Sequence, residues 1–226
     1  MPPVVCVVGR DGSGKTRIIE AIAREMKARG YRVATVARSN EGPALESVTR
    51  DAERYASAGS DMIVVGSPDA VTCVRRVEEE ASLDELIWTV GEEYDLILAE
   101  GFRECGFPKI EVYRGAVGGG LVCRKDELLA LASDTPFDID VSQFGLEDAA
   151  GLGDLIGAKV LATVLPEDAS VYVDGVHLPI ALFVRKMVAS TIIGMLRNLK
   201  GVSQPRSLRV VVRLQREGEA KGRRSK

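Results

Sequence analysis

A glycine-rich segment near the N-terminus is the strongest chemical signal in the sequence. Residues 9–16 read Gly-Arg-Asp-Gly-Ser-Gly-Lys-Thr and match the pattern GxxxxGK[ST], which binds nucleotide phosphates. Its glycines let backbone N–H groups turn inward around an anion, and the following helix adds the positive end of its dipole. Lys15 would supply charge for the β- and γ-phosphates, and the Thr16 hydroxyl would ligate Mg²⁺. The residues assigned to the phosphates are Gly9, Asp11, Gly12, Ser13, Gly14, Lys15 and Thr16.

Such a site needs a second, acidic contact to the metal, carried at the end of a neighbouring strand. Glu100 directly follows the strand-like run 94–99, whereas Asp95 lies at its beginning. Open α/β sheets place their ligand groups at the carboxyl ends of strands. We therefore predict that Glu100 binds the metal and forms the catalytic centre with Lys15; the alternative is a solvated loop charge.

The usual guanine-binding signature NKxD is absent, and residues 123–126 (Cys-Arg-Lys-Asp) match it only in part. Asp134 follows the apolar run 128–132 and would stand at a late strand of the sheet, where its carboxylate could accept hydrogen bonds from a guanine edge. The alternative interpretation of Asp134 is a turn or helix cap before Pro136. Both interpretations stay open at this point.

Strand-like and helical segments alternate around these residues, which favours an α/β fold with a mostly parallel sheet and helices on both faces. Together with the phosphate loop, this order predicts a P-loop NTPase-type nucleotide-binding domain over residues 1–165. The predicted strands are 4–8, 31–37, 62–65, 94–99, 109–113 and 128–132, and the predicted helices are 15–29, 47–58, 83–90 and 146–156.

The pattern changes after Pro166. Alternation around Asp174-Gly175 predicts a hairpin; an apolar helical face from Phe183 to Leu199 and a strand over 208–214 follow. We predict a small β-β-α-β module over residues 168–215 that serves association, either in a homodimer or with a partner enzyme. Alternatively, its helix only closes the module's own core. The basic residues 216–226 are expected to form a mobile tail.

Composition narrows the function classes. The chain has 226 residues and a net charge of −3, so no nucleic-acid or membrane surface is indicated. No apolar run is long enough to span a bilayer, and the N-terminus lacks the order of a secretory signal, which predicts a cytoplasmic protein. Four scattered cysteines and one histidine, His177, argue against a zinc site and against a disulfide framework.

Five segments, in the right order over about residues 4–160, resemble the molybdopterin-guanine dinucleotide biosynthesis protein B (MobB) family. The most specific is Glu100-Gly101-Phe102 followed by Pro-Lys-Ile-Glu-Val at 108–112. The resemblance implies a GTP-binding protein with slow GTPase activity that assists the guanylyltransferase attaching GMP to molybdopterin. The segments are 8–16, 29–33, 51–54 with 58–59, 98–102 and 108–112.

The same resemblance implies that Gly12, Gly14, Lys15 and Thr16 hold the phosphates of GTP. It places Mg²⁺ on Glu100 and Asp51 and puts Lys109 near the site. This sequence departs from bacterial members after the second strand, where they carry a lysine and several histidines. Residues 36–40 here read Val-Ala-Arg-Ser-Asn. Arg38 could supply the positive charge of the missing lysine, but nothing replaces the histidines.

A small-molecule or nucleotide kinase is the alternative, since the loop is also similar to that of thymidylate kinases. Kinases need an arginine-bearing lid over the transferred phosphate. The internal pair Arg75-Arg76 lies in a segment with the pattern of an amphipathic helix and is better explained as a solvated face. A third hypothesis is a nucleotide-gated adapter whose purpose is partner binding rather than turnover.

Overall fold

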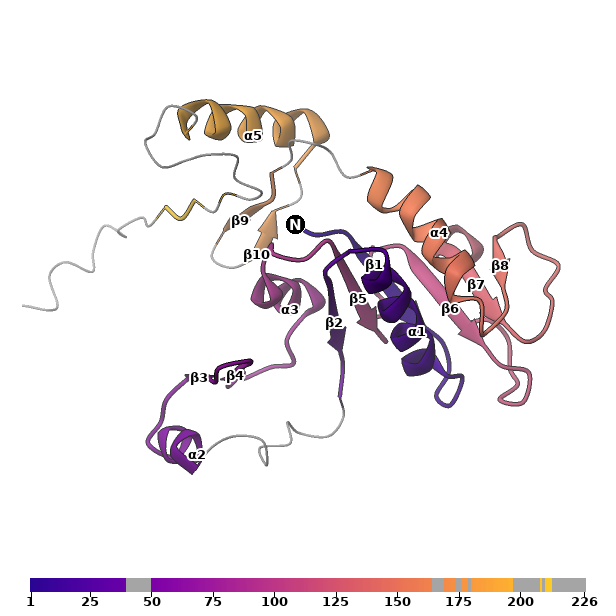
Figure 1. Cartoon of the computed structure of the whole chain (residues 1–226), viewed down its shortest axis with the longest axis horizontal. Helices are drawn as coiled ribbons and strands as arrows, with labels where there is room; N and C mark the ends of the chain where they lie inside the picture. The colour runs from indigo at the N-terminus through magenta and orange to yellow at the C-terminus, as the bar shows by residue number, and fades with distance from the viewer. Residues whose placement is uncertain are drawn as a thin grey trace, which may run out of the picture.

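The computed structural model describes residues 1–39, 50–163, 169–173, 176–178, 180–196, 208 and 210–212, without the side chains of residues 50, 51, 53, 176 and 177. A six-stranded sheet with the order β2-β5-β1-β6-β7-β8 forms its centre, and all its neighbouring strands are parallel (Figure 1). This confirms the predicted α/β class, although the two-residue β8 is too short to leave a sequence pattern. The strands are β1 (Val4–Val8), β2 (Val33–Ala37), β5 (Leu96–Glu100), β6 (Lys109–Tyr113), β7 (Leu128–Ser133) and β8 (Gln143–Phe144).

Helices cover both faces of the sheet, as predicted. α1 (Lys15–Ala28) and α4 (Ala149–Lys159) pack together on one face, and α3 (Leu83–Val90) covers the other. Successive strand residues point to opposite faces, so Val5 of β1 belongs to the first core and Cys6 to the second. The continuous apolar run of β1 thus follows from burial on both sides.

α1 begins at the phosphate loop because Gly14 adopts the left-handed conformation, with φ 97°, just before the first helical residue. Ile18, Ile22 and Met26 recur at four-residue spacing and are buried against the sheet. Gly30, with φ 91°, follows the helix and directs the chain toward β2. The sheet-facing stripe therefore fixes the rotation of the helix whose first turn carries Lys15 and Thr16.

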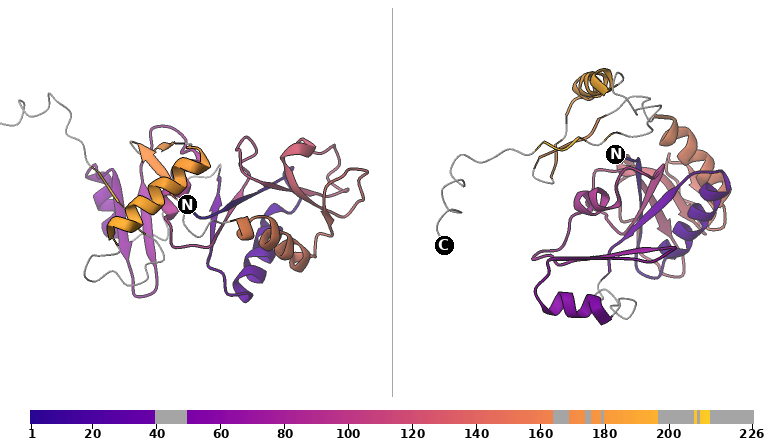
Figure 2. Two further views of the ribbon diagram at one scale, coloured as in Figure 1. Left: turned by 90° about the horizontal axis from the view of Figure 1, so that it is seen from above. Right: turned by 60° about the vertical axis from the view of Figure 1, so that its left-hand side comes forward.

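An antiparallel hairpin of β3 (Met62–Gly66) and β4 (Val71–Arg75) stands apart from the main sheet, next to α2 (Arg50–Ser57) (Figure 2). The prediction of an amphipathic helix around Arg75-Arg76 is wrong. Arg75 ends β4, and the guanidinium of Arg76 donates a 2.9 Å hydrogen bond to a carbonyl oxygen of α2. β4 reads Val-Thr-Cys-Val-Arg, and its β-branched residues favour the extended conformation.

The C-terminal region begins with the antiparallel pair β9 (Val171–Val173) and β10 (Val176–Leu178), which confirms the predicted hairpin. Its turn at Asp174-Gly175 lies outside the described residues. α5 (Leu182–Leu196) follows. The N-terminal ammonium of Met1 reaches this region, with a 3.1 Å hydrogen bond to the hydroxyl oxygen of Ser170.

Other predictions for the C-terminal region are tested only in part. Leu208 and residues 210–212 belong to no strand, while the rest of the strand predicted over 208–214 lies outside the described residues. The predicted boundary between residues 165 and 168 and the tail 216–226 also lie outside them. No helix in the described part of the chain has the length and apolar character needed to cross a bilayer.

Candidate functional site

The glycine-rich segment forms a tight loop between the carboxyl end of β1 and α1. A Cβ atom built on Gly9 would lie 2.4 Å from the carbonyl oxygen of Val112 and 2.9 Å from the Ser13 hydroxyl oxygen. Only glycine permits this approach. Gly12 and Gly14 take positive φ values of 78° and 97°, as expected for a loop that turns its N–H groups inward.

The ammonium of Lys15 folds back over this loop. It donates hydrogen bonds to the Arg10 carbonyl oxygen at 3.1 Å and to Asp11 Oδ1 at 3.3 Å. The lysine side chain is largely covered, whereas Asp11 is fully exposed. The cation is therefore held at the loop by weak, exposed partners that phosphate oxygens could replace. Ser13 Oγ is buried below the loop and has no hydrogen-bond partner among the described residues.

Glu100 lies directly beside the phosphate loop. Thr16 Oγ1 donates a 2.9 Å hydrogen bond to Glu100 Oε1. The contact arises because β5 pairs with β1, with Glu100 opposite Val7, and the Gly101 amide donates to the Val7 carbonyl oxygen at 3.0 Å. A hydroxyl and a carboxylate at this separation supply the hard oxygen ligands that Mg²⁺ prefers.

The third predicted metal ligand, Asp51, lies in α2, and its side chain is outside the described residues. Within the described part of the chain, no three carboxylate, imidazole or thiol groups converge on a metal site. Thr16 and Glu100 would therefore hold Mg²⁺ together with nucleotide phosphate oxygens and water. The donor set fits a metal that arrives with its nucleotide.

Asp134 follows β7, as predicted, and lies against the loop after β6. Its Oδ1 accepts hydrogen bonds from the Gly115 amide at 2.7 Å and from the Thr135 hydroxyl at 3.2 Å. The Gly115 N–H in particular, together with the Thr135 hydroxyl and the nearby Arg114 charge, lowers the pKa of Asp134 below its usual value. The carboxylate thus stays ionised and holds a neighbouring loop, whatever else it binds.

Arg114 was missed by the sequence analysis. Its Nε donates a 3.4 Å hydrogen bond to the Ser13 carbonyl oxygen, and its Nη2 lies 3.3 Å from where a Cβ on Gly14 would be. This half-buried guanidinium directly follows β6, at the same sheet edge as Glu100. The rule that placed Glu100 at a strand end could have found Arg114 as well.

Glu111 of β6 is a buried carboxylate beneath the next loop. It accepts hydrogen bonds from the amides of Val122 at 2.6 Å and Cys123 at 3.0 Å. The same loop contacts the phosphate loop, since Arg10 Nε donates to the Gly120 carbonyl oxygen at 3.3 Å. The Glu111 carboxylate therefore fixes a loop that borders the phosphate loop.

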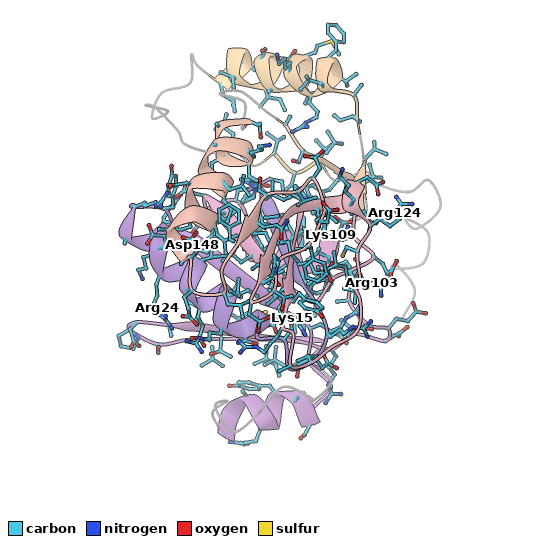
Figure 3. All side chains as sticks on the ribbon, turned by 90° about the vertical axis from the view of Figure 1, so that its right-hand side faces the viewer. Lys15, Arg24, Arg103, Lys109, Arg124 and Asp148 are labelled. Atoms are coloured by element: carbon cyan, nitrogen blue, oxygen red, sulfur yellow. The ribbon has the colours of Figure 1, made fainter. Side chains whose placement is uncertain are left out.

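A polar cavity of about 350 Å³ lies between the phosphate loop, the segment after β5 and the loop after β6. Two arginines, Arg10 and Arg103, line it, and the side of the molecule that carries Lys15 and Arg103 is drawn in Figure 3. Its position at the carboxyl ends of parallel strands is the usual ligand edge of such sheets. The lining residues are Val8, Gly9, Arg10, Asp11, Gly101, Arg103 and Val122.

Lys109 and Arg38 both support the segment after β5. The buried Lys109 ammonium donates a 2.6 Å hydrogen bond to the Cys105 carbonyl oxygen. Arg38 lies with its guanidinium 5.3 Å from the Phe102 ring centroid and forms a 2.6 Å ion pair with Glu80. Both cations therefore contact groups outside the phosphate loop.

Residues 4–134, more than half of the chain, match the family model of molybdopterin guanine dinucleotide synthesis protein B (MobB). The chain belongs to the MobB family. All of the predicted phosphate, metal and base residues fall within the matched range. The resemblance inferred from the sequence is thereby confirmed.

Individual relatives agree with this membership. The molybdopterin-guanine dinucleotide biosynthesis adapter protein of Haemophilus influenzae is 27% identical over 155 residues, covering 68% of this chain and 87% of that protein. A putative adapter protein of the same name from Methanocaldococcus jannaschii is 26% identical over 234 residues, covering 92% and 97%. A crystal structure of molybdopterin-guanine biosynthesis protein B matches with a TM-score of 0.52 and 25% identity, covering 69% of this chain and 98% of that one.

The structure gives Glu111 a testable role in stability. In Glu111→Gln one of the two backbone amides loses its acceptor, because a carboxamide offers one oxygen and one NH₂ group. We expect the free energy of unfolding to fall by about 1–3 kcal/mol, measured by urea denaturation. Glu20→Gln, which removes an exposed ion pair with Arg24, should change it by less than about 0.5 kcal/mol. Equal effects of the two variants would contradict this role.

Proposed function

We propose that this MobB-family chain binds GTP with Mg²⁺ at the phosphate loop and acts as a nucleotide-dependent adapter in molybdopterin guanine dinucleotide biosynthesis. The observation that carries the proposal is the 2.9 Å contact between Thr16 and Glu100. It joins the last residue of the phosphate loop to the acidic end of the adjacent strand, where a metal bound to β- and γ-phosphates would need both.

Each residue has a distinct task in this proposal. The loop amides and Lys15 bind the phosphates, while Thr16 and Glu100 hold the metal, with Asp51 as a further candidate ligand. Bound Mg²⁺ neutralises phosphate charge and orients the terminal phosphoryl group. Arg114, which touches the loop at Ser13, adds a further positive charge for the nucleotide.

The positions of the carboxylates at the site are consistent with slow hydrolysis of GTP. Glu100 accepts a hydrogen bond from Thr16, and Asp11 faces the Lys15 ammonium. Glu100 is the proposed metal ligand and Asp11 is fully exposed on the loop, so neither carboxylate is held as a base for an attacking water. We therefore assign at most a weak GTPase activity and place the function in partner binding.

The kinase alternative gains no support. Arg75 ends a strand of the β3–β4 hairpin, and Arg76 donates to a carbonyl oxygen of α2, so both belong to the hairpin. The expected partner is the guanylyltransferase that attaches GMP to molybdopterin, and we assign its binding, or homodimer formation, to the C-terminal module. The exposure of Phe183 and Met195 on α5, at 76% and 70%, supports an association role.

The phosphate assignment is tested by Lys15→Ala. Loss of one charge-assisted phosphate contact should weaken Mg²⁺·GTP binding about ten- to a hundredfold, measured by isothermal titration calorimetry. Lys27→Ala on the last turn of the same helix is the matched control and should bind like the parent. Parental affinity in Lys15→Ala would exclude the assignment.

A metal role for Glu100 is tested by Glu100→Gln, which keeps an oxygen acceptor for Thr16 while removing the charge. GTP binding with Mg²⁺ should fall several-fold more than GTP binding in the presence of a chelator, because only the metal-bound state needs the carboxylate. Asp95→Asn, at the residue just before the same strand begins, should not change this ratio. An equal loss with and without Mg²⁺ would make Glu100 a structural residue.

The base assignment is tested by Asp134→Asn. The amide oxygen can keep the Gly115 bond, whereas the charge that would accept two guanine donors is lost. The ratio of GTP to ATP affinity should fall about tenfold or more. Asp126→Asn, in the degenerate NKxD-like segment, should leave the ratio unchanged. An unchanged ratio in Asp134→Asn would remove the residue from the base site without affecting the phosphate assignment.

A further inference from the structure

Two thiols meet beside the phosphate loop without forming part of it. The sulfur atoms of Cys6 and Cys105 lie 3.0 Å apart, although 99 positions separate the residues in the chain. Cys6 is completely buried in β1, three residues before the loop begins, and Cys105 is half-buried in the segment after Glu100. A disulfide has a sulfur–sulfur distance of about 2.05 Å, so an approach of about 1 Å would join them.

The surroundings make the two sulfur atoms chemically different. The pKa of Cys105 is lowered to about 6, first by the hydrogen bond with Cys6, then by the Phe107 backbone and the Lys109 charge, against the effect of burial. The pKa of Cys6 is raised by the same hydrogen bond and by burial. Cys105 is thus the more readily ionised of the two thiols, and a hydrogen bond from the neighbouring sulfur favours its thiolate form.

The remaining cysteines lack this arrangement. Burial and the charges of Glu111 and Glu127 raise the pKa of Cys123 to about 11, so it stays a thiol. Cys73 is exposed on the β3–β4 hairpin. Among the described residues, only Cys6 and Cys105 bring two sulfur atoms to within hydrogen-bond distance of each other.

We propose that Cys105 and Cys6 form a redox modification site that takes a low-molecular-weight disulfide as its oxidant and ends as an intramolecular Cys6–Cys105 disulfide. This assignment does not depend on the proposed nucleotide function. Cys105 is the attacking sulfur because it is the partly accessible one of the pair, and Cys6 resolves the intermediate because it is buried 3.0 Å behind it.

Two exchange steps complete the reaction. The Cys105 thiolate attacks one sulfur of glutathione disulfide; a protein–glutathione disulfide forms, and one glutathione thiolate leaves and takes a proton from solvent. Cys6 then gives up its proton and attacks the Cys105 sulfur, which releases the second glutathione. The two protein thiols lose two electrons, and one glutathione disulfide becomes two glutathione thiols.

The Cys6–Cys105 disulfide would constrain a segment that forms one wall of the cavity at the candidate site. It ties β1 to the segment that contains Gly101 and Arg103, both of which line that cavity. In the dithiol form this segment is held by noncovalent contacts such as the Lys109 bond to the Cys105 carbonyl oxygen. A covalent link at Cys105 would restrict local opening of the segment.

The chemistry is tested on the folded full-length Cys73→Ser protein, incubated with glutathione disulfide at neutral pH and analysed by peptide mass spectrometry. We expect a Cys6–Cys105 disulfide with no retained glutathione, while Cys123 stays a thiol. When Cys6→Ser is added, the reaction should halt at the mixed disulfide, so that glutathione stays attached to Cys105. When Cys105→Ser is added instead, Cys6 should not react. A Cys6–Cys123 disulfide, or unreacted thiols at Cys6 and Cys105, would overturn the proposal.

The restriction of the segment is measured independently by limited proteolysis of the parent protein in its two redox forms. Trypsin cleavage after Arg103 should be several-fold slower in the disulfide form than in the dithiol form, and a reducing agent should restore the faster rate. Arg124, exposed on another loop, is the internal control and should be cleaved equally in both forms (Figure 3). Equal cleavage after Arg103 in both forms would overturn the proposal that the disulfide restricts opening of this segment.

Discussion

The geometry of the candidate site depends on the close approach of Gly9 to the Val112 carbonyl oxygen. A Cβ atom at Gly9 would lie 2.4 Å from that oxygen, so the first residue of the phosphate loop rests directly on β6. On the other side, the Gly101 amide donates to Val7 of β1. β1 is therefore held between its two neighbours at the point where the loop leaves the sheet. This alignment brings Thr16, at the far end of the loop, within hydrogen-bond distance of Glu100.

The parts of this arrangement that could be predicted are those with a local signal. The strands over residues 4–8 and 109–113 and the helix over 83–90 were predicted with their observed bounds, because apolar runs and caps mark them within a few residues. Glu100 was placed beside the phosphate loop by the strand-end rule, and the structure brings it to Thr16. Local pattern and sheet topology agree at these positions.

The remaining contacts join residues that lie far apart in the sequence, so no local pattern predicts them. Arg114 reaches Ser13 across about half the chain, and Cys6 meets Cys105 across a similar span. These pairs follow from the strand order, in which β1 lies between β5 and β6, and that order becomes visible only in the folded sheet. The strand containing Arg75 was missed for another reason: the Arg75-Arg76 pair was judged by its charge, whereas the β-branched residues just before it favour extended backbone, which pairs with β3.

The positive charges around the candidate site come from residues at strand ends and in the phosphate loop, and the composition of the whole chain does not predict them. The chain carries a net charge of −3, yet Arg10, Lys15, Arg103 and Arg114 gather around the phosphate loop and its cavity. Several nearby carboxylates are already engaged locally. Asp11 faces Lys15, and Asp134 holds the Gly115 amide. An anionic ligand at this edge would meet these cations although the protein as a whole is acidic, so net charge is a poor guide to what this surface binds.

β6 explains why a charged motif lies inside the sheet. Its residues alternate: Ile110 and Val112 belong to the core beneath α1, whereas Lys109 and Glu111 point to the opposite side and are almost completely buried. Burying a charge is costly unless strong hydrogen bonds compensate it. Lys109 binds the Cys105 carbonyl oxygen, and Glu111 binds the amides of the loop after β6. One strand thus holds both segments that wall the cavity, and its Lys-Ile-Glu sequence positions the site through them.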